Sequence, residues 1–577
     1  MTVDSVTIAL VGSGGAGAMT AGQMLLDAAA NVGWYGLMSR STGPQIRGGE
    51  AAALVRLSPT PVHGPGDRFD LIVAFDWQNV ERFAAELPLS DKSVIITDPS
   101  QGPVPPVLAA SGARQVELPI KELAARIPGG RVNMVGLGAV AAIVGLPRAG
   151  IDAVIRKALG KKGDAAIQAS NAGIDAGAKE AAGWNLGLEL AAPNAIPKQD
   201  GATRWNISGN EAAGLGALKG GVKFCAAYPI TPATEILEWL APNLAKTGGK
   251  LVQAEDELAS IAMCLGASFS GVPSITATAG PGLSLMTECI GLGVASETPV
   301  VIVDVQRGGP STGIPTKSEQ SDLNIAVYGL HGDAPHLVVG PTSIGDCLFT
   351  TQWAVHLAEA LQTVAIVLSD QAMGQSRAIV DKPADAPYKA NRLLATDLGG
   401  EGKYLRYANT ESGISPAAIP GMPGGEHTAD GLEHAENALP SSQASDHQKQ
   451  LDKRLRKLTS YDYGDAWADI EGEGEVAVIT WGSATGPSRE AVRRLEAAGR
   501  KARLIAIRLI SPVQPARLAA ALEGVTKVLV VEQTHGAQFH KFLRGHYDLP
   551  GEVSVFSRPG PLPIRAREVH ETLLSLI

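Results

Sequence analysis

Two short segments of the chain combine side chains that can hydrogen-bond a ligand or exchange a proton. The first is a proline-stiffened turn that carries a hydroxyl group, and it reads Tyr228, Pro229, Ile230, Thr231 and Pro232. The second places the acids Glu255, Asp256 and Glu257 where an apolar run gives way to small residues of helical character. A carboxyl group buried in an apolar slot has a raised pKa, which suits proton exchange near neutral pH. The turn and the acids are therefore the first candidates for a catalytic site.

The same three acids also have a purely structural interpretation. Acidic residues in the first turn of a helix cap its free N–H groups and interact favourably with the helix dipole. The catalytic interpretation requires one buried carboxylate, and Glu257 is the acid that directly precedes the small-residue run 258–267. These residues alone leave both interpretations open.

The elements that position these residues alternate between strands and helices along most of the chain. A length of 577 residues, 67 glycines and only 5% aromatic residues indicate several tightly packed α/β units rather than a β-sandwich. We expect the following units: a Rossmann-like domain at 1–190, a linker at 191–208, a central α/β domain at 209–382, an irregular insertion with one charged helix at 383–465, and a compact α/β domain at 466–577.

Short apolar runs bounded by polar turns predict the buried strands of these units. In the first domain the runs lie at 6–11, 71–75 and 93–97, and the segment 31–35 is expected to form a strand after the first helix. This rhythm predicts a mostly parallel, doubly wound sheet. In the central domain we expect strands at 224–227, 274–277, 300–305 and 363–368.

Charge and composition exclude several classes of protein. A formal net charge of -9 argues against a nucleic-acid-binding protein, which normally presents a basic surface. No apolar run approaches the roughly 20 residues of a membrane helix, and no signal peptide is apparent, so we expect a cytoplasmic protein without a membrane segment. The four cysteines are scattered without a C-x-x-C pair, which argues against a disulfide framework or a metal centre held by this chain alone.

A glycine loop near the N-terminus is a candidate phosphate-binding site. It follows a strand and matches G-x-G-x-x-G over residues 12–17, with Gly14 and Gly15 at its centre. Arg40 and Arg47 follow nearby and could hold a 2′-phosphate of NADP or the phosphates of an acyl carrier such as coenzyme A. Tight packing of a strand against a helix explains such a loop equally well.

Taken in order along the chain, these motifs resemble the 2-oxoacid:ferredoxin oxidoreductases. The resemblance rests on the turn at 228–232, the acids at 255–257, Thr-Ala-Gly-Pro-Gly at 278–282 and the loop at 307–317. It covers nearly the whole chain. The first domain resembles the gamma domain of the family, fused ahead of an alpha subunit. The central domain resembles a thiamine diphosphate pyrimidine-binding domain, and the last resembles a transketolase C-terminal domain.

The resemblance implies a role for each residue of the central motifs. In thiamine enzymes the activating Glu precedes a helix glycine by nine positions, and Glu257 with Gly266 has this spacing whereas Glu255 does not. The remaining contacts to the pyrimidine ring are then expected from Tyr228, Pro229, Ile230 and Thr231.

The resemblance also implies how a 2-oxoacid substrate is held. Thr231 would hydrogen-bond the carboxylate or carbonyl of the acid, and Arg307 would neutralise the carboxylate. Thr316 would line the pocket for the acid's side chain, and Lys317 is the candidate cation for the second carboxylate of a dicarboxylic acid.

Two features that such an enzyme requires are missing from the sequence. The chain has no Gly-Asp-Gly motif to hold Mg²⁺ and the diphosphate, and no set of cysteines for a [4Fe–4S] cluster. Both absences fit an alpha subunit whose beta partner supplies the diphosphate site, the magnesium and the cluster. The resemblance thus implies a ferredoxin as electron acceptor, an assembly of two alpha and two beta subunits, and no activity of this chain alone.

The substrate that fits the resemblance best is 2-oxoglutarate, converted reversibly with coenzyme A to succinyl-CoA and CO₂. A pyruvate-specific or broad-specificity enzyme is the alternative within the family. An alternative of another class is a non-catalytic module that binds NADP or coenzyme A as a sensor.

Overall fold

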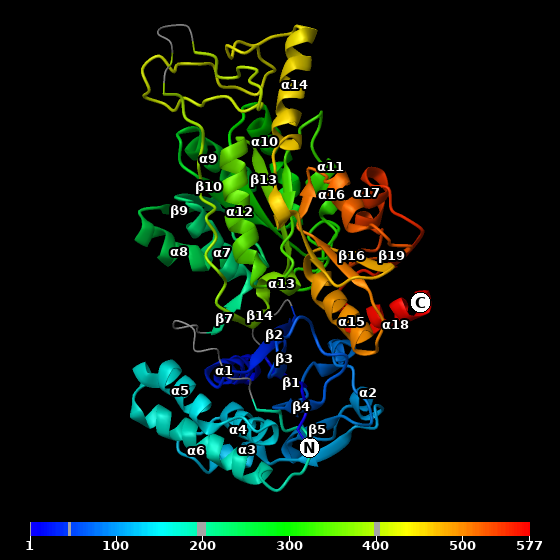
Figure 1. Ribbon diagram of the computed structural model, residues 1–577. Helices are drawn as coiled ribbons and strands as arrows, with labels where there is room; N and C mark the ends of the chain where they lie inside the picture. The colour runs from blue at the N-terminus through cyan, green and yellow to red at the C-terminus, as the bar shows by residue number, and fades with distance from the viewer. Residues whose placement is uncertain (1, 44–47, 193–203, 397, 399–403) are drawn as a thin grey trace. The chain divides into compact units, whose positions relative to one another are not determined.

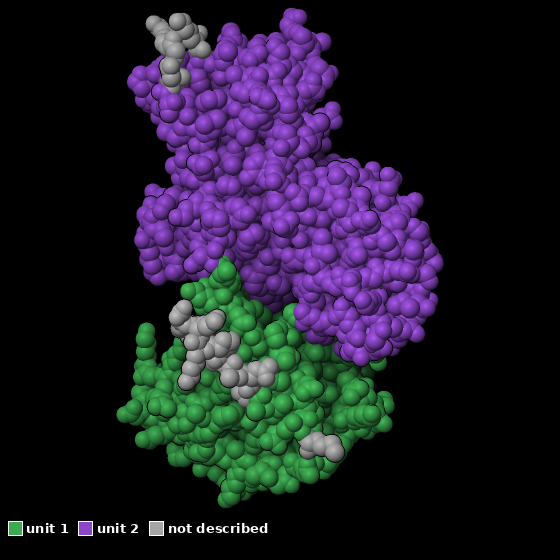
Figure 2. All heavy atoms as spheres, in the orientation of Figure 1, with its two compact units in different colours: residues 1–208, 375–384, 562–568 green, residues 209–374, 385–561, 569–577 purple. Residues whose placement is uncertain are grey.

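The chain folds into two compact units, which Figure 1 shows as a ribbon and Figure 2 in separate colours. The computed structural model describes residues 2–43, 48–192, 204–396, 398 and 404–577. The first unit comprises 1–208, 375–384 and 562–568, and the second comprises 209–374, 385–561 and 569–577. Within the described ranges, no helix combines the length and the apolarity needed to cross a membrane.

The first unit is built on one eight-stranded sheet that is buried on both faces. Ile8 and Leu10 pack with helices α1 and α4, whereas Ala9 and Val11, which point the other way, belong to a second core. The strand order is β6-β5-β4-β1-β3-β2-β14-β7, and the bounds are β1 (Val6–Ser13), β2 (Tyr35–Thr42), β3 (Glu50–Ser58), β4 (Leu71–Ala74), β5 (Val94–Thr97), β6 (Arg114–Glu117), β7 (Arg204–Ser208) and β14 (Arg377–Asp381). The helices are α1 (Ala18–Asn31), α2 (Pro106–Ala109), α3 (Ile120–Ala125), α4 (Val132–Val144), α5 (Arg148–Leu159) and α6 (Asp164–Ala181).

This sheet is mixed, which corrects the prediction of a mostly parallel one. Strands β1, β4, β5 and β6 pair in parallel, but β3 runs antiparallel to both β1 and β2. The strand expected at 31–35 begins only at Tyr35, because α1 continues to Asn31 and Gly33 turns the chain with a φ of 91°. The antiparallel β3 was missed because its pairing partner cannot be read from its own residues.

Two strands extend the first sheet from ranges that the sequence assigned elsewhere. β7 lies in the expected linker, and β14 lies in the expected central domain, yet both pair antiparallel into the first sheet. The hydroxyl of Tyr35 donates to Asp381 at 2.8 Å, and the guanidinium of Arg204 lies 3.7 Å from the centre of the Tyr35 ring. The returning strand satisfies backbone groups at the free edge of β2, so residues 375–384 belong to the first unit.

The second unit contains a seven-stranded sheet whose central strands are buried on both faces. Its order is β18-β12-β13-β11-β10-β8-β9, and all neighbours are parallel except β12 and β18. The strands are β8 (Phe224–Ala227), β9 (Lys250–Gln253), β10 (Ser274–Thr278), β11 (Val300–Gln306), β12 (Leu337–Val339), β13 (Val364–Asp370) and β18 (Leu509–Ser511). The four strands expected in this domain are present as β8, β10, β11 and β13. The helices are α7 (Gly209–Gly220), α8 (Thr234–Leu244), α9 (Glu257–Phe269), α10 (Gly280–Ala295), α11 (Leu323–Tyr328), α12 (Asp346–Leu361) and α13 (Gln371–Gln375).

A five-stranded sheet in the order β15-β17-β16-β19-β20 forms the rest of the second unit. Its strands are β15 (Ala468–Glu471), β16 (Val476–Thr480), β17 (Arg503–Ile507), β19 (Lys527–Glu532) and β20 (Glu552–Ser557), with helices α15 (Thr485–Ala497), α16 (Pro515–Ala521), α17 (Gln538–His546) and α18 (Ala566–Leu576). Gln320 joins it to the first part of the unit, because its side chain donates to the carbonyl of Trp481 and accepts from the N–H of Gln533. β18 crosses over to pair with β12.

The helix α14 (Ala444–Thr459) is fastened to the central sheet region by a buried ion cluster. Lys453 and Lys457, one turn apart, both contact the carboxylate of Glu297, and the Nζ of Lys457 lies 3.2 Å from its Oε2. All three side chains are at most 1% exposed. Burial alone raises the pKa of Glu297, but the two lysines and Arg406 hold it below its usual range.

We expect the substitution Glu297→Gln to destabilise the second unit strongly. It leaves two buried lysines without their counter-charge, and breaking such a buried pair costs about 3–5 kcal/mol. The measurement is the urea concentration at which the unit unfolds. The matched control is Glu473→Gln, which removes the exposed pair with Lys501 and should leave the midpoint unchanged. Equal midpoints for Glu297→Gln and wild type would contradict this role.

Candidate active site

The predicted site residues gather at one edge of the seven-stranded sheet. β8, β9, β10 and β11 pair in parallel, so their carboxyl ends lie at the same edge. The turn with Thr231 follows β8, the three acids follow β9, the glycine loop 279–282 follows β10, and Arg307 follows β11. Ligands of open α/β sheets bind at this edge.

Backbone contacts fix the turn that carries Thr231. The N–H of Ala233 donates to the carbonyl of Ile230 at 2.8 Å, and the buried Asn210 donates to the carbonyl of Pro232 at 2.9 Å. The guanidinium of Arg307 donates from Nη1 to the carbonyl of Thr231 at 2.5 Å. Within the turn, these bonds involve backbone groups and no side chain. The hydroxyl of Thr231 and the 40% exposed ring of Tyr228 therefore remain at the surface of the site.

The structure separates the three acids at the head of α9. Asp256 is the N-cap, and its carboxylate accepts from the N–H of Ala259 at 2.7 Å. Glu255 is exposed, whereas Glu257 is only 6% exposed. Because Asp256 does the capping, the burial of Glu257 is not explained by the needs of the helix terminus.

Two glycines make room for the acidic side chains of the site. A Cβ at Gly282 would lie 2.6 Å from Cγ of Glu257 and 2.0 Å from Oγ1 of Thr278. A Cβ at Gly280 would lie 2.7 Å from both carboxyl oxygens of Asp322. The first turn of α10 therefore packs directly against Glu257 and Asp322.

Arg307 is a buried cation at the end of β11, with 6% of its surface exposed. Burial lowers the pKa of its guanidinium, and the nearby Asp322 opposes this effect. Its Nε has no hydrogen-bond partner within the part of the chain that the structure describes. Such a buried and incompletely paired guanidinium is suited to hold an anion.

The loop after Arg307 folds back so that residues 316 and 317 return to its base. The N–H of Gly308 donates to the carbonyl of Lys317 at 3.0 Å, and the N–H of Ile314 donates to the carbonyl of Gly308 at 2.7 Å. Gly313 needs its φ of 55° and its lack of a side chain, since a Cβ would lie 1.6 Å from the Gly308 carbonyl oxygen. Thr316 and Lys317 are both partly buried, and Lys317 has a further interaction within the chain.

Two acids that were not singled out from the sequence, Asp304 and Asp322, lie close to each other, and Asp322 is near Arg307. Asp304 is fully buried within β11, and burial followed by the neighbouring Asp322 raises its pKa well above the usual range. Burial raises the pKa of Asp322 to about 7. The available signal was the acid inside the otherwise apolar run 300–305, because a buried acid there needs a specific partner.

The glycine loop of the first unit satisfies part of its own hydrogen-bonding capacity. The N–H of Gly14 donates to the carbonyl of Gly49 at 2.8 Å, and Asp76 accepts from both the N–H and the hydroxyl of Ser13. Gly15 has a φ of 109°, and the N-terminus of α1 has no side-chain cap. Arg40 lies within β2 rather than in the loop that follows it, and Arg47 lies outside the described residues.

The thiols of the second unit are unsuited to metal binding by this chain. Cys225, Cys264 and Cys347 are buried, and burial raises the pKa of Cys264 to about 12. A thiol must lose its proton to bind a metal, so these groups are poor ligands. Within the described ranges, no group of three or more His, Cys, Asp or Glu residues is placed to hold a metal ion.

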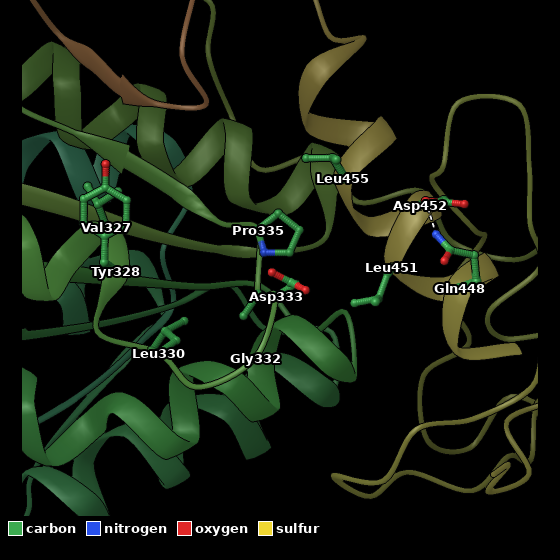
Figure 3. A pocket seen from close by; sticks show the side chains of 11 residues that line it. Val327, Tyr328, Leu330, Gly332, Asp333, Pro335, Gln448, Leu451, Asp452 and Leu455 are labelled. Carbon is green, nitrogen blue, oxygen red and sulfur yellow. Dashed lines mark hydrogen bonds between the residues drawn. The ribbon is translucent and has the colours of Figure 1, made fainter. Parts of the chain in front are cut away.

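A separate pocket of about 510 Å³ lies between the loop after α11 and helix α14, as Figure 3 shows. Its apolar lining comes from Val327, Leu330, Pro335, Leu451 and Leu455. None of the residues singled out from the sequence lines this pocket, so it is distinct from the candidate site.

Comparison with known proteins confirms the resemblance that the motifs predict. Residues 215–453 match the thiamine diphosphate-binding model of the pyruvate flavodoxin/ferredoxin oxidoreductases, and residues 7–180 match the pyruvate ferredoxin/flavodoxin oxidoreductase model. The thiamine-binding model spans the turn, the acids, both glycines and Arg307.

Relatives and a solved structure agree with these models. The chain is 36% identical to the 2-oxoglutarate synthase subunit KorA of Methanothermobacter marburgensis over 59% of its length and 90% of that protein. It is 37% identical to the 2-oxoglutarate oxidoreductase subunit KorA of Mycobacterium tuberculosis over 63% of its length, and spans 57% of that longer protein. A solved 2-oxoglutarate:ferredoxin oxidoreductase from Magnetococcus marinus, with 2-oxoglutarate, coenzyme A and succinyl-CoA bound, has a TM-score of 0.90 at 34% identity, covering 99% of both chains.

We expect Gly282→Ala to distort the site. The new Cβ would overlap Thr278 and Glu257 and push the carboxyl of Glu257 outward, and overpacking of this kind costs about 1–3 kcal/mol. Thermal unfolding measures the loss. Gly266→Ala is the matched control, because it also lies in a helix but has open space around it, so it should be neutral or stabilising. Equal losses for the two variants would contradict the close approach of Gly282 to Glu257.

Proposed function

The chain belongs to the 2-oxoacid:ferredoxin oxidoreductase family, and we propose that it is the fused gamma–alpha subunit of a 2-oxoglutarate:ferredoxin oxidoreductase. The reaction joins 2-oxoglutarate and coenzyme A to give succinyl-CoA, CO₂ and one proton, while two electrons pass singly to two molecules of oxidised ferredoxin. With a strong reductant the same steps run in reverse and fix CO₂. A cytoplasmic location remains our prediction.

The observation that supports this function most strongly is the buried carboxyl of Glu257. It stands at the head of α9 against a glycine, while its neighbour Asp256 caps the helix. These features fit the aminopyrimidine half of thiamine diphosphate, with Glu257 as the hydrogen-bond partner of the ring and the turn at 228–231 as a second contact. When bound, thiamine diphosphate supplies the electron sink for the decarboxylation. Glu257 would hydrogen-bond the ring nitrogen and orient the ring.

The residues around Arg307 support binding of a 2-oxoacid. The buried guanidinium neutralises the substrate carboxylate next to the 2-oxo group. Arg307 also donates to the backbone carbonyl of Thr231, and the hydroxyl of Thr231 hydrogen-bonds the same end of the acid. We propose that Thr316 and Lys317, at the base of the folded loop, contact the other end of the acid. A lysine there favours a dicarboxylic acid, in line with the names of the KorA relatives.

The surface of α9 and α10 supports a partner that completes the site. Leu258, Met263 and Leu285 are 48%, 43% and 50% exposed beside the buried Glu257. Gly266 and Gly291 have open space where a side chain would stand, so packing within this chain does not explain a helix glycine there. Because the sequence lacks Gly-Asp-Gly, the occupant we propose is the beta subunit, with its diphosphate site, magnesium and [4Fe–4S] cluster. The assembly we propose has two copies of each chain.

The first unit is the proposed contributor to the coenzyme A site. The uncapped N-terminus of α1 and the backbone at Gly15 are suited to phosphate oxygens, with Arg40 and Arg47 as the candidate cations, whereas the N–H of Gly14 already donates to Gly49. Because Asp76 already occupies the N–H and hydroxyl of Ser13, the donors left for a phosphate lie on the helix side of the loop.

We expect Glu257→Gln to lower the kcat of the complex with its beta partner by at least about 10²-fold, the size of a lost acid–base contribution. Ferredoxin reduction measures this loss. Assembly with the partner should persist, because Gln preserves the volume of the side chain. The matched control is the exposed Glu255→Gln, which should retain activity. A Glu257→Gln complex with wild-type kcat would rule out the assignment, as would ligand binding without turnover by the wild-type complex.

Substrate choice is tested by the kcat/KM of the complex for 2-oxoglutarate and for pyruvate. We expect 2-oxoglutarate to be preferred, and Lys317→Met to raise its KM by about tenfold or more while leaving pyruvate unaffected, because the pair of a cation with a carboxylate is lost. A higher kcat/KM for pyruvate with the wild-type complex would instead establish the pyruvate or broad-specificity alternative.

A further inference from the structure

Asp304 and Asp322 lie close together, Asp322 interacts with the charge of Arg307, and three of the four carboxyl oxygens of the two acids have no hydrogen-bond donor among the described residues. Asp304 is 0% exposed, and neither of its carboxyl oxygens receives a hydrogen bond from any other described group. The buried Oδ2 of Asp322 is in the same position. The two carboxyl groups instead contact each other.

Two ionised carboxylates cannot satisfy each other, because each is only an acceptor. A buried pair in contact becomes stable when one proton lies between them, which turns repulsion into a hydrogen bond. Among the described residues, no other group donates a hydrogen bond to Asp304, which lies within the apolar strand β11. The backbone N–H of Asp322 is held by Oε1 of Gln306 at 3.0 Å, and Gln306 is itself anchored to the carbonyl of Ser369.

We propose that Asp304 and Asp322 share one proton and set the charge beside Arg307. Building on the proposed function of Arg307 as the group that binds the 2-oxoacid carboxylate, the pair acts as a positioning device. Once Asp322 ionises, the pair shares one proton, carries a single negative charge and competes with the substrate for the guanidinium. When both acids are protonated, the pair is neutral and leaves Arg307 able to bind an anion.

The groups that face this pair are few. Arg307 and Glu319 are the charged groups that act on Asp322, and Asp322 is the one that acts on Asp304. From α10, Gly280 lies against the carboxyl group of Asp322. Glu319 accepts from the N–H groups of Gly309 and Gly560, and His535 lies near it. The negative charge of Glu319 adds to the retention of the shared proton.

The direction of the pH effect follows from the raised pKa of the pair. In the unfolded chain both acids ionise near their ordinary values, whereas in the folded chain Asp322 keeps its proton up to about pH 7. The folded state therefore binds more protons over this range, and its extra stability is present at low pH and is lost as pH rises through about 7.

The test is Asp304→Asn, in which an amide N–H replaces the shared proton as donor to Asp322. For the chain alone, the melting temperature of the variant relative to wild type should rise by about 2–4 °C or more between pH 5.5 and pH 9. Asp333→Asn removes an exposed acid and should show a constant difference. A difference that is also constant for Asp304→Asn would overturn the shared proton. If Asp304→Asn does not fold, Asp322→Asn gives the same donor to Asp304 and answers the same question.

The charge-setting role is read from the KM of the complex with its beta partner. For wild type, the KM for 2-oxoglutarate should rise about tenfold between pH 6.5 and pH 8.5 at constant kcat, because the acid pair becomes negatively charged beside Arg307 as Asp322 ionises. For Asp304→Asn, the KM should change by less than about twofold. Equal KM profiles for the two proteins would overturn this role. If the wild-type complex oxidises no 2-oxoacid, the proposed function fails, while the melting temperatures still decide whether the proton is shared.

Discussion

The close approach of Glu257 to Gly282 is the contact on which the rest of the site depends. It requires a glycine in the first turn of α10, a second helix that begins at the acid, and a separate residue, Asp256, to cap that second helix. These conditions are met only because β9 and β10 run in the same direction and end at the same edge of the sheet. The parallel sheet of the second unit is therefore the scaffold that makes a buried acid available at a ligand-facing edge.

Buried charged groups of both signs lie at this edge of the sheet. Arg307 lies at the end of β11 and donates to the turn with Thr231, and the acids Asp304 and Asp322 lie nearby. A buried cation needs counter-charge to be stable, but full neutralisation would prevent it from binding a substrate anion. The acid pair we propose can meet both requirements, because it supplies a counter-charge when it holds one proton and withholds that charge when it holds two.

Local patterns in the sequence predict the elements that carry the candidate site. The runs that form β8, β10 and β11, the acids ahead of α9 and the glycines after β10 are all readable from neighbouring residues. The choice of Glu257 over Glu255 instead rested on the spacing to Gly266 that the family resemblance implies, and in the structure Glu257 is the buried acid of the two. What could not be predicted depends on contacts between distant residues. The pairing of β14 with β2, the antiparallel β3 and the meeting of Asp304 with Asp322 arise from tertiary packing, which one sequence does not display.

On the proposed function, this chain provides half of a coenzyme site and a second polypeptide provides the other half. The most direct test is a structure of the complex with its beta partner, determined in the presence of thiamine diphosphate and Mg²⁺. The predicted result is a pyrimidine ring in contact with the carboxyl of Glu257, with the diphosphate and the metal held by the partner. A coenzyme seated entirely within one copy of this chain, or with its ring far from Glu257, would contradict the account.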